Sequence, residues 1–116
     1  MKRLLLAMML TGISYTADAA VSGNDLYDWG LAMERVNEQG SRSADDTMKA
    51  GVFMGYVNSA IDFTQVLGTV CLPSNVISRQ GWDIVLNYLK AHPELRNDSA
   101  ALSAVNALKG AYPCPK

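Results

Sequence analysis

Hydrophobic positions along this chain recur with the period of an α-helix, most clearly in the stretch 50–73, AGVFMGYVNSAIDFTQVLGTVCLP. At 100° per residue its apolar side chains gather on one broad face, which is wide enough to form the central wall of a small core. The residues on this face are Phe53, Tyr56, Val57, Ala60, Phe63 and Leu67. The pattern predicts a long helix that ends near Leu67, at Gly68.

A second stripe runs along the other side of this predicted helix. It is small at its N-terminal end and hydrogen-bonding at its C-terminal end: Gly51, Gly55, Asn58, Asp62, Gln65 and Thr69. Two glycines inside a helix cost about 1 kcal/mol each relative to alanine, so another interaction should benefit from the missing side chains. Either a neighbouring helix packs closely on the stripe, or a partner protein lies on it. Asn58, Asp62 and Gln65 are the candidate partner-binding residues, although a solvated face or a dimer mate would also account for them.

Three further segments show the same helical period, at 22–38, from about 78 to 91, and from about 99 to 112. Proline and glycine punctuation separates them, and no stretch alternates with period two for more than four residues. We therefore expect an all-α fold, a small helical domain of four or five helices closed by one disulfide. The predicted N-caps are Ser22 or Asn24, Ser43 or Asp45, Ser78, and Asp98 or Ser99.

The first nineteen residues have the pattern of a secretory signal peptide. Lys2 and Arg3 precede an apolar run over 4–13, and small residues surround the Ala17-Asp18-Ala19 site. The run is about half the length of about 20 residues that a membrane span needs. We expect residues 1–19 to be cleaved and 20–116 to form one periplasmic helical domain that has no membrane attachment.

Charge excludes some classes of partner. Without Lys2, Arg3 and Asp18 the 10 basic and 11 acidic residues fall to 8 and 10, a net charge of −2 with no block of either sign. Nucleic acid and anionic membranes attract strongly basic surfaces, so neither is an expected partner.

Two cysteines, Cys71 and Cys114, are the only ones in the chain. In an oxidising compartment such an even pair favours a disulfide over free thiols. The bond would close a loop of about 44 residues, which the chain-entropy model values at ~4 kcal/mol. A domain of this size is marginally stable on its hydrophobic core alone, so the bond would be a large share of its stability.

Candidate catalytic chemistry is sparse. The single histidine, His92, stands at a predicted helix end, where an imidazolium would complement the helix dipole. A zinc site needs more His or Cys ligands than the chain holds. Asp45 and Asp46 are adjacent, point apart on a helix start, and are better explained as N-terminal capping residues. We expect no enzyme activity, no metal and no cofactor, and a protein that acts by binding.

Several short elements together resemble the Rap/Tai family of type VI secretion immunity proteins. They are the GYV element within Gly51–Val57, the Cys71-Leu72-Pro73 turn, the segment VLNYLKAHPE at Val85–Glu94, and the ending Tyr112-Pro113-Cys114. The resemblance implies a small helical periplasmic protein that binds a peptidoglycan amidase effector and blocks its active site. It would protect the producing cell, either as a monomer or as a homodimer.

The chain departs from this family in one respect. Many similar proteins carry two further cysteines, one in the first helix and one just before the GYV element, at places that Gly30 or a neighbour and Phe53 hold here. Losing both together is expected if the two form a second disulfide in those relatives. Two other classes stay open from the sequence, a periplasmic helical chaperone and an envelope protein without a cognate toxin.

Overall fold

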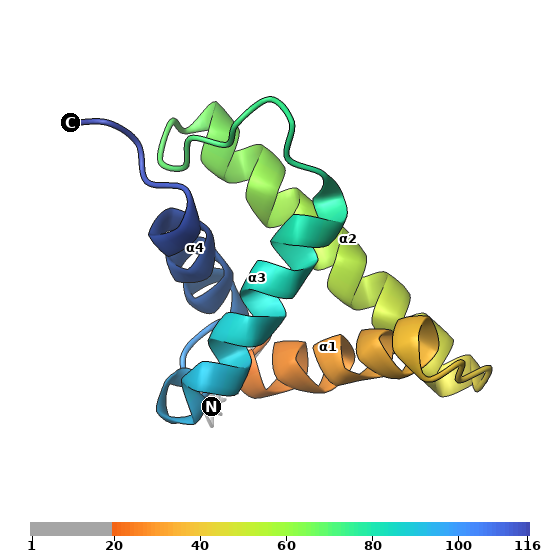
Figure 1. The fold of residues 1–116 in the computed structure, drawn as a ribbon. Coiled ribbons are helices and arrows are strands. Elements are labelled where there is room, and N and C mark those ends of the chain that lie inside the picture. Colours follow the sequence, from red (N-terminus) through yellow and green to blue (C-terminus); the bar gives the residue numbers. More distant parts are fainter. Residues whose placement is uncertain (1–19) are drawn as a thin grey trace, which may run out of the picture.

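The computed structural model describes residues 20–116, and the predicted signal segment 1–19 lies outside them. Within this range the chain forms four α-helices and one short 3₁₀ turn, with no strand (Figure 1). The elements are α1 (Gly23–Glu38), α2 (Ala44–Val66), α3 (Ser78–Ala91), η1 (Pro93–Leu95) and α4 (Ala100–Ala111). The all-α prediction is confirmed. None of the helices in the described part of the chain has the length and apolarity that crossing a membrane requires.

The long helix α2 is the wall on which the other helices are arranged. In Figure 1, α1, α2 and α3 outline a triangle, and α4 lies beside α3 near the C-terminal end of α2. The start of α1 is tied to the start of α4, because Val21 O accepts a hydrogen bond from Ala100 N at 2.8 Å and Gly23 N donates to Asp98 O at 2.8 Å. The N-terminal end of the described chain is therefore held against the start of the last helix.

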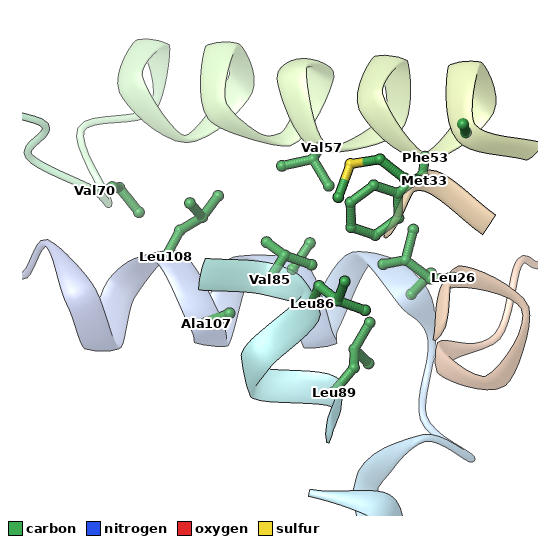
Figure 2. Packing of buried hydrophobic residues seen from close by; sticks show 13 residues of the cluster. Leu26, Met33, Phe53, Val57, Val70, Val85, Leu86, Leu89, Ala107 and Leu108 are labelled. Carbon is green, nitrogen blue, oxygen red and sulfur yellow. The ribbon is translucent and has the colours of Figure 1, made fainter. Parts of the chain in front are cut away.

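One hydrophobic core fills the space between the four helices. Figure 2 shows Phe53 and Val57 pointing from α2 toward the side chains of α3 and α4. α4 contributes mainly alanines, whose small side chains let its backbone approach the other helices closely. The buried hydrophobic cluster consists of Leu26, Met33, Ala50, Phe53, Val57, Val70, Val85, Leu86, Leu89, Ala100, Ala104, Ala107 and Leu108.

A close contact between α1 and α2 depends on Gly30. A Cβ added at this glycine would lie 2.7 Å from Leu86 Cδ1 and 2.9 Å from Phe53 Cε2, so the Phe53 ring occupies the space where a side chain would be. Positions 30 and 53, where the family resemblance leads us to expect two further cysteines in similar proteins, are thus neighbours in the fold. Their adjacency agrees with the expectation that cysteines there would bridge.

Three of the four α-helices begin at the serine N-caps that the sequence predicts. The hydroxyls of Ser22, Ser43 and Ser99 accept hydrogen bonds from backbone N–H groups in the first turns of α1, α2 and α4. The prediction for α3 is wrong: Ser78 is the first helical residue and Ile77 is the N-cap. Gln80 explains the shift, because its Oε1 accepts the Ile77 backbone N–H at 2.9 Å and fixes the chain one residue earlier.

The apolar face predicted for α2 is only partly in the core. Phe53 and Val57 are fully buried, but Phe63 and Leu67 have 69% and 70% of their surface exposed. The predicted face spans about a third of the helix circumference at 100° per residue. The core covers only the half of that face that carries Phe53 and Val57. Near the end of α2 the residue that points inward is Thr64, whose hydroxyl donates a hydrogen bond to Ala60 O at 2.7 Å. Placing Phe63 and Leu67 in the core was therefore wrong.

Candidate partner-binding surface

The C-terminal end of α2 and the C-terminal end of α4 are joined covalently. Cys71 and Cys114 form a disulfide with a Cα–Cα distance of 4.9 Å, which confirms the predicted pair. A backbone hydrogen bond from Cys71 N to Tyr112 O, at 3.0 Å, supports the same junction. The adjacent Val70 is buried, with 3% of its surface exposed. Together these contacts hold the two helix ends at a defined separation.

An open apolar groove of about 750 Å³ lies along α2 and is bordered by α4. No acidic or basic side chain lines it. The lining residues are Gly51, Val52, Gly55, Tyr56, Ser59, Ala60, Phe63, Thr64, Leu67, Thr69, Ala101 and Val105. A groove of this size and polarity is within the range of binding sites in proteins.

The glycines of α2 open this groove, and no close contact with another part of residues 20–116 accounts for them. A Cβ added at Gly51 or Gly55 would meet no atom within 4 Å. The interpretation that they allow close packing against a neighbouring helix is therefore wrong. Such packing occurs instead at Gly81, where a Cβ would come within 2.5 Å of Ile61 Cδ1. No contact within residues 20–116 offsets the free energy that Gly51 and Gly55 cost the helix relative to alanine.

Exposed large hydrophobic side chains are concentrated on the same helix. Of seven such residues in the described chain, five belong to α2 or its C-cap, and the other two are Ile77 and Leu102. Val66 is the most exposed, at 85%. The five are Met48, Val52, Phe63, Val66 and Leu67. Val52, Phe63 and Leu67 also line the groove, and exposed apolar side chains grouped in this way are typical of interaction surfaces.

The predicted partner-binding residues lie beside this groove and do not line it. Asn58 is half-buried, and its Oδ1 accepts a hydrogen bond from Trp82 Nε1 at 2.9 Å, which ties α2 to α3. Asp62 and Gln65 are exposed. Gln65 borders a smaller hollow of about 210 Å³ next to the 72–78 loop. The predicted stripe therefore does not form one surface: its two glycines and Thr69 line the groove, whereas Gln65 lines the smaller hollow. The role of Asn58, Asp62 and Gln65 in partner binding stays a prediction.

Charged residues near the α1–α2 junction are engaged with one another. Arg35 Nη2 lies 2.7 Å from Asp46 Oδ1, and Ser41 Oγ donates to Asp46 Oδ2 at 2.7 Å. These hydrogen bonds lower the pKa of Asp46 to about 2, with Arg35 the largest cause. Lys49 Nζ lies 3.0 Å from both Asp28 and Asp45. The adjacent Asp45 and Asp46 therefore pair with different cations and do not act as a carboxylate pair.

The single histidine, His92, contacts side chains that are close to it in the sequence. The His92 ring lies 4.6 Å from the Tyr88 ring, and its Nδ1 is 3.2 Å from Glu94 Oε1. Within residues 20–116, no group of three or more His, Cys, Asp or Glu side chains is arranged to hold a metal ion.

Of the groove residues, sequence reasoning placed only Gly51, Gly55 and Thr69 on the surface stripe. It assigned four others to the core face and did not single out the remaining five: Tyr56, Ala60, Phe63 and Leu67, and then Val52, Ser59, Thr64, Ala101 and Val105. Recurrence of small residues every four positions, at 51, 55 and 59, was the available signal in α2. Nothing comparable marks Ala101 and Val105, which join the surface only through the placement of α4.

A comparison with protein families matches residues 22–114 to a family described as Rap1a immunity proteins. This range includes the four helices and both cysteines. Neither the curated proteins nor the solved structures contain a significant match to the chain.

Proposed function

The chain belongs to the Rap1a family of immunity proteins, the Rap/Tai group associated with type VI secretion, and on that premise we propose that it neutralises a peptidoglycan amidase effector in the periplasm. Membership implies a partner effector protein. The observation that carries the proposal is the extent of the family match, which covers residues 22–114 and so nearly the whole described domain.

Binding, and not catalysis, is the proposed mode of action. The two cysteines are bonded to each other, and the single histidine contacts Tyr88 and Glu94. A catalytic site needs a nucleophile, a base and an orienting group within hydrogen-bond reach of one another. The largest surface feature described above is the uncharged apolar groove along α2, and exposed apolar surface of this kind suits contact with another protein.

The periplasm is the proposed compartment for two reasons. The pattern of residues 1–19 is that of a secretory signal, and the Cys71–Cys114 disulfide suits an oxidising environment such as the bacterial periplasm. An amidase that cleaves peptidoglycan would also act there, so inhibitor and target would share a compartment.

Co-expression with a peptidoglycan amidase tests the function, and the candidate to use is one encoded next to the gene for this protein; absence of any such neighbour would count against the proposal. The amidase is directed to the periplasm with this protein, with no partner, or with this protein lacking residues 1–19. We expect growth to be rescued only by the full chain, and the purified pair to co-elute and to lose amidase activity on isolated peptidoglycan. Absence of rescue by a folded, exported protein would contradict the proposal, and rescue against a hydrolase of another bond class would correct the amidase assignment.

The proposed contact residues need a design that separates binding from folding. Asn58→Ala would leave the half-buried Trp82 Nε1 without its partner, so this variant also perturbs the fold. Asp62→Ala and Gln65→Ala remove exposed side chains and are the cleaner tests. Each should weaken the effector complex by about 1 to 2 kcal/mol if it lies in the buried interface. Asn87→Ala, at an exposed position of α3, is the matched control. Unchanged affinity in the Asp62 and Gln65 variants would mean that the effector binds elsewhere.

A further inference from the structure

The hydrophobic core of this domain is modest. Thirteen buried residues form it, and four of them are alanines, whose side chains bury little surface. Three large apolar side chains near the end of α2 add little to it, since Phe63, Val66 and Leu67 are 69%, 85% and 70% exposed. Burial of apolar surface is the main favourable term in folding, and small domains bury the least of it. The noncovalent contacts alone therefore give a fold of low stability.

The groove lowers that stability further. Gly51 and Gly55 lie inside α2 and line the groove, and a Cβ added at either position would meet no atom within 4 Å. Relative to alanine, two such glycines together lower the ratio of folded to unfolded protein about 30-fold. Keeping the groove open therefore weakens the fold.

The Cys71–Cys114 bond acts in the opposite direction. It joins residues 43 positions apart, and in the chain-entropy model closing a loop of this length raises the folded-to-unfolded ratio about a thousandfold. That factor exceeds the roughly 30-fold loss at the two glycines. We propose that the bond is a redox switch for the groove: the chain with two free thiols, the dithiol form, is largely unfolded, and only the oxidised chain presents the groove to a partner.

The switching step is a two-electron oxidation. The thiols of Cys71 and Cys114 each lose a proton, their sulfur atoms bond, and the two electrons reduce the disulfide of an oxidant to a dithiol. Cys71 is exposed and Cys114 is partly exposed in the folded chain, so an oxidant can approach the pair from solvent. The backbone hydrogen bond from Cys71 N to Tyr112 O brings the two residues together without their sulfur atoms. Transient folding of the dithiol form therefore aligns the thiols that then stabilise it.

The switch would restrict the proposed inhibitor to one compartment. A chain made in the reducing cytoplasm holds two thiols and stays largely unfolded, whereas export to an oxidising compartment allows the bond to form. This regulation rests on the proposed function: the inhibitor would be inactive where its effector is synthesised and active where an amidase reaches peptidoglycan. The redox dependence of folding itself requires no effector.

The first test measures folding alone. The chain 20–116 is prepared as the disulfide and, in excess dithiothreitol, as the dithiol form, and a short protease pulse at about 37 °C cleaves the unfolded molecules. We expect the oxidised protein to survive and the dithiol form to lose most of its intact chain. Joint Gly51→Ala and Gly55→Ala should restore survival of the dithiol form, because its folded-to-unfolded ratio rises about 30-fold. Ser74→Ala, at an exposed loop position, is the matched control and should restore nothing.

The second test measures inhibition. Amidase activity on isolated peptidoglycan is followed with the oxidised chain, with the dithiol form, and with dithiothreitol alone as the control. The dithiol form should inhibit more weakly in inverse proportion to its folded fraction, about tenfold when a tenth of it is folded. Equal survival of the two forms in the protease pulse would overturn the redox switch, as would equal inhibition or a failure of the two alanines to protect the dithiol form. If neither form inhibits while only the dithiol form is cleaved, the proposed function is wrong and the redox switch of folding stands.

Discussion

Removing the disulfide should cost the domain a large share of its stability. The change is the double substitution Cys71→Ser with Cys114→Ser, which deletes a cross-link between residues 43 positions apart. Closing a loop of about 44 residues in the unfolded chain is worth ~4 kcal/mol in the chain-entropy model. Typical domains have a free energy of unfolding of only about 5 to 15 kcal/mol, so the variant should be marginal at room temperature.

Two contacts next to the disulfide in the folded structure do not depend on its sulfur atoms. Val70 stays available for burial in the variant, and the hydrogen bond from Cys71 N to Tyr112 O involves only backbone atoms. The substitution should therefore act mainly on the unfolded ensemble and leave α1 to α4 in place. Without the cross-link the unfolded chain is also less compact, so the dependence of unfolding on denaturant should steepen.

Urea unfolding followed by the fluorescence of Trp29 and Trp82 measures the effect. The control is a Ser74→Ala variant, which alters an exposed side chain in the loop after Cys71 and leaves the bond intact. We expect the double variant to unfold at much lower urea than either the unmodified chain or the control. A loss below about 1 kcal/mol would refute the reasoning, because it would mean that the unfolded chain is already restricted without the bond.

Three further substitutions test other parts of the structure. Gly55→Ala should raise the free energy of unfolding by about 1 kcal/mol, because the added methyl group meets no atom within 4 Å and alanine favours the helix; a lower free energy of unfolding would show that the position is closely packed. Gly30→Ala should destabilise by about 1 to 3 kcal/mol, since its Cβ would overlap Phe53 and Leu86, and calorimetry would decide this. Asp46→Asn should lower the melting temperature at neutral pH. The carboxylate pKa falls from 3.8 to about 2 in the fold, so its contribution is complete above 3.8 and disappears as pH drops through about 2, where the two melting temperatures should converge.

Helix positions were predictable from the sequence because the signals that set them are local. Serines at 22, 43 and 99 cap the helices that follow them. Gly68 terminates α2 with a φ of 66°, a conformation that suits glycine. The Ser78 prediction failed since two local signals compete there, and the side chain of Gln80 prevails.

The candidate surface was less accessible to sequence reasoning. Periodicity assigns Phe53 and Phe63 to one broad face of α2, but it cannot show how far the other helices extend along that face. Phe63 is exposed because α4 borders the groove without filling it. Similarly, an asparagine in a stripe does not reveal that Trp82, 24 residues away, occupies its side-chain carbonyl. These features depend on tertiary placement, which no local pattern contains.

The shared space at Gly30 and Phe53 constrains how this family can vary. Because the ring of Phe53 fills the volume that a side chain at Gly30 would take, neither position can change freely while the other stays fixed. A larger residue at 30 requires a smaller one at 53 and a shift of Leu86 Cδ1, which would lie 2.7 Å from the added Cβ, and a pair of cysteines is another way for positions 30 and 53 to share this space. Across descendants of a common ancestor, the two positions should therefore mutate as a coupled pair, and intermediates that carry only one of the changes should be rare.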